Sequence, residues 1–191
     1  MTLLCELGKK YKTDKTPLLG YHNYTPFYYE LLKDKRYTVK KVFEMGIGNV
    51  PEMAFLGWHY KPGASLRMWR DFFPNAMIYG ADILPEVLFK EDRIETFLCD
   101  ERDPKSVADL IGKIGSDIDL FVDDGSHDVQ AQINLCKYAM PLLKRDVIYI
   151  IEDVHQNRRI GRGLAKIGLK TYLGDNVRLG SRDKILIIKH D

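Results

Sequence analysis

Two acidic segments, each ending in a histidine, follow apolar runs of strand length. They read Val122-Asp-Asp-Gly-Ser-His127 and Ile150-Ile-Glu-Asp-Val-His155. If both runs are parallel strands of one sheet, their carboxyl ends meet at the same edge. Crowded carboxylates would repel one another there, unless they cap helices or point to water. A hard divalent cation such as Mg²⁺, which takes oxygen ligands, would relieve the repulsion, and Mn²⁺ and Ca²⁺ accept similar ligands. The carboxylates that would meet are Asp123, Asp124, Glu152 and Asp153.

His127 lies three residues beyond Asp124, across a Gly-Ser turn. A histidine beside a cation-bound hydroxyl is suited to act as a general base, because its side chain titrates near neutral pH. The alternative is a hydrogen-bonded structural histidine, but the neighbouring carboxylates favour a functional role. Both roles stay open for His155, and the remaining histidines have structural or surface roles by default: His22, His59 and His190.

A Gly-x-Gly turn follows the first apolar run, Val42-Phe-Glu-Met-Gly-Ile-Gly48. These glycines would allow tight backbone conformations and the close approach of a ligand. No third glycine follows at the spacing of a dinucleotide fingerprint, and the next helix begins only near Ser65, which we expect to cap it. Between them, Asn49–Gly63 is an irregular insertion with exposed-looking Phe55, Trp58 and Tyr60. An adenosine-containing ligand without phosphates therefore fits better than a pyrophosphate.

Two further carboxylates end strand-like runs, and either could simply cap a helix or face water. Asp82 follows Tyr79-Gly-Ala, where a carboxylate can accept both ribose hydroxyls. Asp100 follows Phe97-Leu-Cys and is placed to accept from an adenine amino group. With Glu44 in the first run, acidic groups recur at three consecutive strands, which favours a nucleoside site.

The order of apolar patterns predicts the elements that would position these groups. Most strand-like runs are continuous rather than alternating, as in strands buried on both faces of a parallel sheet. Helical stripes lie between them, and the longest, from Val129 to Leu143, should be shortened by Pro141. Alternating strands and helices predict an α/β, doubly wound, Rossmann-like fold. We expect a mostly parallel seven-stranded sheet with helices on both faces and an antiparallel last strand.

The two ends of the chain depart from this alternation. Residues 1–36 are expected to form a helical cover without a strand, packed on a core of residues 37–191, so that 1–191 is one domain. Near the C-terminus, a helix over Arg159–Lys166 precedes strand-like Thr171–Leu179 and Lys184–Lys189. A turn at Gly180–Asp183 would make the last strand antiparallel to its neighbour.

Composition excludes several functional classes. The 191 residues carry a net charge of +2, which leaves no electrostatic footprint for nucleic acid. No apolar run has the roughly 20 residues needed to span a bilayer, and the start lacks the features of a signal peptide. Three scattered cysteines without a CxxC motif indicate neither a disulfide framework nor a thiolate zinc site. We therefore expect a cytoplasmic protein with no membrane or nucleic-acid partner.

Taken together, these segments resemble the metal-dependent class I methyltransferases that use S-adenosylmethionine on sugar hydroxyls. The similarity is to the macrolide-sugar and polysaccharide O-methyltransferases and covers nearly the whole chain, including Thr13-Asp-Lys15 and Tyr21-His-Asn-Tyr-Thr-Pro26. Asn49–Pro62 departs from the family, because it is longer and more aromatic than the expected Gly-rich loop. The other matching segments are Glu44–Gly48, Gly63–Trp69, Tyr79–Asp82, Asp123–His127 and Ile151–His155.

The resemblance implies a role for each candidate residue. His127 would be the general base. The metal ligands would be Asp124, Glu152 and Asp153, with Mg²⁺ as the expected ion. The residues that would bind S-adenosylmethionine are Glu44, Gly46, Gly48, Ser65, Asp82, Asp100 and Asp123.

The expected reaction is an in-line methyl transfer to a sugar or a glycosylated compound. The cation would lower the pKa of one of two neighbouring hydroxyls, and His127 would remove its proton. The acceptor site would be built from the N-terminal cover, the Asn49–Ala64 insertion and, in a homo-oligomer, a neighbouring subunit. Alternatives on the same fold are a nicotinamide-dependent oxidoreductase, a metal-dependent hydrolase and a non-catalytic nucleotide-binding protein. The absent third glycine and the acidic pair argue against the oxidoreductase.

Overall fold

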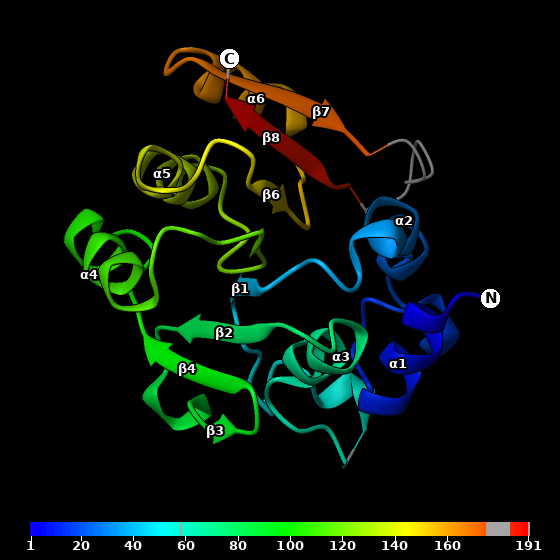
Figure 1. Ribbon diagram of the computed structural model, residues 1–191. Helices are drawn as coiled ribbons and strands as arrows, with labels where there is room; N and C mark the ends of the chain where they lie inside the picture. Colours follow the sequence, from blue (N-terminus) through cyan, green and yellow to red (C-terminus); the bar gives the residue numbers. More distant parts are fainter. Residues whose placement is uncertain (58, 175–183, 191) are drawn as a thin grey trace.

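The computed structural model describes residues 1–57, 59–174 and 184–190, and these form one mixed sheet of eight strands flanked by helices (Figure 1). The strand order is β3-β4-β2-β1-β5-β6-β8-β7. The five strands from β4 to β6 in this order are parallel, and β3, β7 and β8 pair antiparallel. The strands are β1 (Lys41–Met45), β2 (Met77–Asp82), β3 (Lys90–Glu91), β4 (Ile94–Leu98), β5 (Leu120–Asp123), β6 (Ile148–Ile151), β7 (Leu169–Leu173) and β8 (Leu186–His190).

The fold class predicted from the sequence is confirmed, and the number of strands needs one correction. The additional strand is β3, whose two residues pair with β4 and are too few to leave a periodic pattern. The run expected over Thr171–Leu179 begins earlier, at Leu169, and is described as far as Leu173. Residues 175–179 of that run and the turn expected at Gly180–Asp183 lie outside the described residues.

Six α-helices cover the two faces of the sheet in the described part of the chain. The expected shortening at Pro141 is confirmed, because α5 ends at Ala139 and a 3₁₀ turn (Met140–Leu142) follows. No helix of the described residues combines the length and the apolar character needed to cross a bilayer. The helices are α1 (Leu3–Tyr11), α2 (Tyr24–Leu32), α3 (Ala64–Phe72), α4 (Pro104–Ile114), α5 (Val129–Ala139) and α6 (Asn157–Ala165).

Two hydrophobic cores lie on opposite faces of the sheet. One packs α4, α5 and α6 against one face, and the other packs α1, α2 and α3 against the other face (Figure 1). Alternate residues of β1 supply both cores, with Val42 facing one and Phe43 facing the other. Continuous apolar strands are therefore required, because neither face of the central sheet meets water.

The N-terminal helices α1 and α2 lie on one face of the sheet, and α1 packs on α3. A polar contact supports this packing, because Asp71 on α3 accepts hydrogen bonds from Lys10 (2.8 Å) and Tyr11 (2.5 Å) on α1. The backbone between α1 and α2 then passes Thr13, Asp14 and Lys15 along the carboxyl ends of the central strands. The cover therefore contributes side chains to that edge.

The carboxyl ends of β1 and β5 mark the point where the strand order changes direction. Strand β1 pairs with β2 on one side and with β5 on the other, so the loops after these strands diverge. Open α/β sheets bind ligands in the crevice formed at such a point. The candidate side chains of the sequence lie at the same edge.

Candidate active site

A cavity of 360 Å³ opens at the carboxyl ends of the central strands. It brings together most of the residues that the sequence singled out, from both the proposed cofactor set and the proposed cation set. Three predicted residues do not line it, because they are buried beneath its floor: Glu44, Asp123 and Glu152. The predicted residues that line it are Gly46, Gly48, Ser65, Asp82, Asp100, Asp124, His127 and Asp153.

Gly46 and Gly48 both have positive φ, at 90° and 75°, in the turn that follows β1. A Cβ on Gly46 would collide with the backbone oxygen of Asp124, and a Cβ on Gly48 would collide with the Tyr60 hydroxyl. Gly46 thus lets the turn after β1 pack directly against the loop after β5. Glycine is therefore required at both positions by contacts within the protein, whether or not a ligand is bound.

Backbone amides hold the carboxylates on the β1–β2–β4 side of the cavity. Asp82 accepts hydrogen bonds from the amide of Ile47 (2.9 Å) and from that of Leu84 (3.0 Å). Asp100 accepts from the amide of Arg102 at 2.9 Å. Both carboxylates retain lone pairs toward the cavity that they line, so both can accept from a ligand hydroxyl or amino group.

Glu44 lies beneath this side of the cavity and is fully buried. One of its oxygens accepts a hydrogen bond from the Ser65 hydroxyl at 2.6 Å, and the other accepts from the indole of Trp69. Ser65 lies in the first turn of α3, and Gly63 is the N-cap residue, so the expected cap at Ser65 is wrong. The Ser65 side chain does not cap because it is used to hold Glu44.

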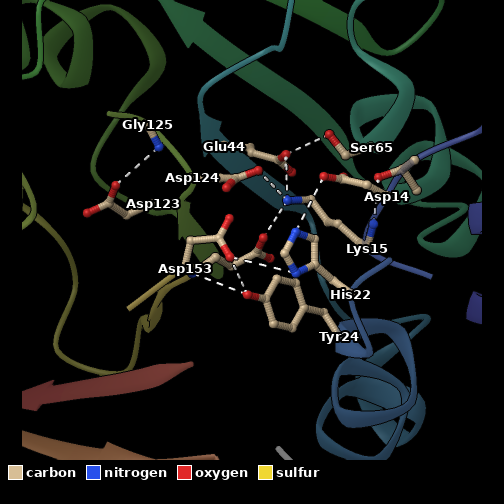
Figure 2. Close-up of polar contacts among 12 residues, drawn as sticks. Asp14, Lys15, His22, Tyr24, Glu44, Ser65, Asp123, Asp124, Gly125 and Asp153 are labelled. Carbon is tan, nitrogen blue, oxygen red and sulfur yellow. Dashed lines mark hydrogen bonds and ion pairs between the residues drawn. The ribbon is translucent and has the colours of Figure 1, made fainter. Parts of the chain in front are cut away.

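Asp124, His127 and Asp153 form a compact group on the β5–β6 side of the cavity. One ligand atom from each lies within 4.8 Å of the others, a spacing that could hold a metal ion. His127 Nδ1 is 3.1 Å from Asp153 Oδ2, and its Nε2 is 3.7 Å from Asp124 Oδ1. Tyr24, which belongs to the N-terminal cover, donates a hydrogen bond of 2.6 Å from its hydroxyl to Asp153 (Figure 2).

Charge interactions set the protonation of this group. Burial alone would lower the pKa of His127, but the hydrogen bond to Asp153 and the charge of Asp124 raise it to about 9. Burial raises the pKa of Asp124 to about 6, although Lys15 opposes the change. For Asp153, burial is outweighed by the hydrogen bond from His127, which holds its pKa below the usual value. At neutral pH the imidazole therefore keeps its proton, hydrogen-bonded to Asp153 and attracted by the charge of Asp124.

His127 and Asp153 also share an unusual backbone conformation. Their φ angles are 56° and 48°, in the left-handed region that residues other than glycine rarely adopt. Such strain is retained only where the surrounding structure enforces it, and it concentrates at functional sites. Two of the four described non-glycine residues with positive φ thus lie in this one group.

The principal residue that the sequence did not predict is Lys15. Its side chain is 2% exposed, and its Nζ lies 2.5 Å from Asp124 Oδ2 (Figure 2). The same Nζ lies 2.5 Å from Glu152 Oε2. The Tyr28 hydroxyl donates to the other oxygen of Glu152 at 2.5 Å. Glu152 is thus engaged by protein donors on both oxygens. Sequence separation hid these contacts, because Lys15 and Glu152 are 137 positions apart.

Asp123, beneath the cavity, and Glu101, in the cavity lining, are a second pair of buried acids. Asp123 is 1% exposed, and burial together with the charge of Glu101 raises its pKa well above the usual range. Among the described residues its Oδ2 has no hydrogen-bond partner. Glu101, which the sequence did not single out, lines the cavity and accepts from the Ser126 amide at 3.1 Å.

The other histidines differ in their surroundings. His22 stacks on Tyr24 with ring centroids 4.9 Å apart, and it lies 3.8 Å from Asp153 and 3.7 Å from Asp14. His22 is thus near the site, although the sequence left it unassigned. His155 and His59 are exposed and do not line the cavity.

The aromatic residues of the insertion and the cover serve different purposes. Tyr60 is buried at 9% exposure, contrary to the expectation of an exposed ring, because it packs over Gly48. Phe55 is exposed as expected and meets the ring of Tyr21 edge-on, at 4.6 Å between centroids. Tyr24 is buried, and Trp58 lies outside the described residues.

Comparison with known proteins gives a consistent set of relatives, although no family model matches the chain. The chain is 32% identical over 151 residues to a rhamnosyl tetracenomycin-C 2'-O-methyltransferase from Streptomyces olivaceus, covering 79% of this chain and 37% of that protein. It is 35% identical over 154 residues to the mycinamicin VI 2''-O-methyltransferase from Micromonospora griseorubida, covering 79% and 36%.

Solved structures give the same result. The MycE methyltransferase of mycinamycin biosynthesis, in complex with Mg and SAH, matches with a TM-score of 0.74 and 25% identity, over 97% of this chain and 54% of that chain. In its complex with Mg, SAH and mycinamycin VI, it matches with a TM-score of 0.66 and 33% identity, over 78% and 36%. The chain thus spans only a little over a third of the length of the curated relatives. The chain has the class I methyltransferase fold and is a homologue of the sugar O-methyltransferases of macrolide and polyketide pathways.

Proposed function

We propose that this chain carries the catalytic part of an S-adenosylmethionine-dependent O-methyltransferase that acts on a hydroxyl of a sugar in a glycosylated natural product. The observation that carries the proposal is that one cavity contains residues of both predicted sets, the cofactor-binding set and the cation-binding set. A cofactor along Gly46 and Asp82 would lie next to a cation and a base at Asp124 and His127. That adjacency is what methyl transfer to an activated hydroxyl requires.

The cofactor residues fit an adenosine-containing ligand by the chemistry that they present. Asp82 and Asp100 offer carboxylate oxygens to the ribose hydroxyls and the adenine amino group, and backbone amides already fix the position of both. Ser65 lines the cavity as a hydroxyl donor or acceptor. Glu44 would act from below, by orienting Ser65 rather than by touching the cofactor.

The cation residues fit a hard divalent ion, because the donors that face the cavity are mainly carboxylate oxygens. Asp124 and Asp153 would be the principal ligands, and Glu152 would reach the ion only by sharing an oxygen with Lys15. The bound ion, with Mg²⁺ expected, would supply the charge that lowers the pKa of an acceptor hydroxyl. The MycE complexes with Mg and SAH support this pairing of cofactors.

His127 would take the proton of the acceptor hydroxyl. In the metal-free protein it is held protonated by Asp153 and Asp124, which are also the predicted cation ligands. If these carboxylates bound a cation, they would stabilise the protonated imidazole less. His127 would then become a base close to neutral pH, as general-base catalysis requires.

The remaining parts of the proposal concern organisation and partners. Residues 1–36 would act as a cover on the catalytic core of 37–191, within one domain. The acceptor is expected to be a small glycosylated compound rather than a nucleic acid, in a cytoplasmic enzyme that can form a homo-oligomer. The methyltransferase names of the relatives support methyl transfer over the nicotinamide-dependent oxidoreductase.

Calorimetric titration tests the cofactor part directly. S-adenosylhomocysteine should bind the protein, and NAD should not. Tight binding of NAD without binding of S-adenosylhomocysteine would overturn the proposal. With a competent sugar acceptor, EDTA should abolish methyl transfer and added Mg²⁺ should restore it, whereas full activity in EDTA would exclude the cation from the reaction.

A further inference from the structure

Lys15 lies at the centre of the carboxylates that the sequence assigned to the cation and the cofactor. Its Nζ is 2.5 Å from Asp124 Oδ2, 2.5 Å from Glu152 Oε2 and 3.6 Å from Glu44 Oε1. Glu44 lies in β1, and Asp124 and Glu152 are the first residues after β5 and β6. A single ammonium group therefore joins the carboxyl ends of the central sheet.

The backbone holds Lys15 firmly in this position. Its carbonyl oxygen accepts hydrogen bonds from the amides of Tyr24 and Thr25, both at 3.0 Å, at the start of α2. Its side chain is 2% exposed, so the charge has little contact with water. Removal of a lysine from water is costly unless the charge is paired, and here three acids pair with it.

The same carboxylates are required by the proposed divalent ion. Asp124 offers one oxygen to Lys15 and the other to the group with His127 and Asp153. Glu152 has no unengaged oxygen, because Tyr28 and Lys15 donate to its two oxygens. Any cation bound at Asp124 therefore lies close to a fixed positive charge with which it shares a ligand.

We infer that Lys15 is a positioning residue that acts as a built-in counter-ion: it holds the acidic cluster together without metal and weakens the binding of the divalent ion. This inference rests on the proposed function. Two positive charges a few ångströms apart repel each other strongly in a site with little water. Lys15 thus keeps the ion exchangeable, and it also prevents the carboxylates from forcing the strand ends apart when the ion is absent.

The test is a titration with Mn²⁺, followed by electron paramagnetic resonance, on the protein without cofactor or acceptor. Lys15→Met removes the charge and keeps a side chain of similar length. Lys15→Arg keeps the charge. Lys10→Met is the matched control, because Lys10 pairs with Asp71 on α3, away from the cavity. Thermal unfolding in EDTA and in Mn²⁺ is measured on the same four proteins.

Lys15→Met should bind Mn²⁺ at least about tenfold more tightly than the wild type, since a repulsive charge has been removed. Lys15→Arg and Lys10→Met should bind it as the wild type does. Lys15→Met should also unfold at a lower temperature in EDTA and regain most of the difference in Mn²⁺. A merely structural role for Lys15 would lower the unfolding temperature without tightening Mn²⁺ binding.

Unchanged or weaker Mn²⁺ binding by Lys15→Met would overturn the inference and leave the proposed function standing. Absence of Mn²⁺ binding by the wild-type protein would instead overturn the cation part of the proposed function, and the inference with it. If Lys15→Met does not fold without metal, it can be purified in Mn²⁺ and its affinity measured by competition with a chelator. Lys15→Gln gives a second neutral variant for the same comparison.

Discussion

The two halves of the cavity hold their acidic side chains by different means. On the β1–β2–β4 side, backbone amides within the same edge of the sheet hold Asp82 and Asp100. On the β5–β6 side, side chains from the N-terminal cover hold Asp153 and Glu152, chiefly Tyr24, Tyr28 and Lys15. The first half is complete once the sheet has formed. The second half also requires that α1 and α2 dock on the sheet.

Under the proposed function, this difference would separate binding of the cofactor from activation of the acceptor. Changes on the cation side should stop the reaction and leave cofactor binding nearly intact, and changes on the cofactor side should do the reverse. A loss of both properties from one conservative substitution would indicate that the two halves are not separable.

The largest effect is expected for Asp124→Asn. The substitution removes a charge that both the proposed cation and His127 use, at nearly unchanged side-chain volume. Methyl transfer should fall by more than about a thousandfold, because the site loses its cation and with it the means to lower the pKa of the hydroxyl. The affinity for S-adenosylhomocysteine, measured by calorimetry, should change by less than about threefold, and a large loss would argue against separate halves.

His127→Ala should have the next largest effect. Loss of a general base lowers rates by about 10² to 10⁴-fold. Mn²⁺ and S-adenosylhomocysteine should still bind, which distinguishes this variant from Asp124→Asn. His155→Ala is the control, since His155 is exposed and lies outside the cavity lining. Equal losses in both histidine variants would contradict the role assigned to His127.

Asp82→Asn tests the opposite half. It should weaken S-adenosylhomocysteine by about 5- to 100-fold, the range expected for the loss of charge-assisted hydrogen bonds. Mn²⁺ affinity should stay at the wild-type value, because Asp82 does not touch the β5–β6 group. A parallel loss of Mn²⁺ affinity would show that the cofactor side supports the cation side.

Acid should loosen the docking of the cover. Burial opposes the change, but the combined hydrogen bonds from Lys10, Tyr11 and Arg70 outweigh it and lower the pKa of Asp71 to about 2 from the usual 3.8. A depressed folded-state pKa stabilises the protein above the unfolded value, and this contribution is lost as pH falls from about 4 through 2. The loss should be at most about 2 kcal/mol after allowance for partial exposure. Urea unfolding across this range should show a smaller decline for Asp71→Asn than for the wild type, and equal declines would contradict the assignment.

The smallest effect concerns the insertion after β1. The Tyr21 hydroxyl donates to the carbonyl of Phe55 at 2.7 Å and links the cover to the insertion. Tyr21→Phe removes one exposed hydrogen bond and keeps the ring contact. Amide hydrogen exchange in residues 49–57 should accelerate by less than about fivefold. No change in exchange would show that the ring contact alone holds the two segments.

The part of the site that could be predicted from the sequence is the part that local order determines. Asp82 ends an apolar strand, and Asp124 and His127 lie in the loop after another, so the topology alone brings them to one edge. Lys15 could not be found in this way, because its contacts with Asp124 and Glu152 span 109 and 137 positions. Its role depends on how the cover docks, for which the sequence offers no periodic signal.

Other details of the fold could not be predicted from the sequence, for different physical reasons. A two-residue strand such as β3 has no periodicity to detect. The start of α3 was misplaced because Ser65 is a favoured capping residue by type, yet its hydroxyl donates to Glu44 in the fold. Glu44 and Glu152 have the residue type of site ligands, but burial directs both carboxylates to protein donors. Burial of a single side chain depends on the packing of distant elements, which spacing along the chain does not record.

The most direct test of the account is a crystal structure of the protein soaked with Mn²⁺ and S-adenosylhomocysteine, with the manganese located by its anomalous scattering. The account predicts one manganese peak between Asp124 and Asp153, with the adenosine moiety along Gly46, Asp82 and Asp100 in the other half of the cavity. A manganese peak away from Asp124 and Asp153, or a cofactor bound outside this cavity, would contradict it.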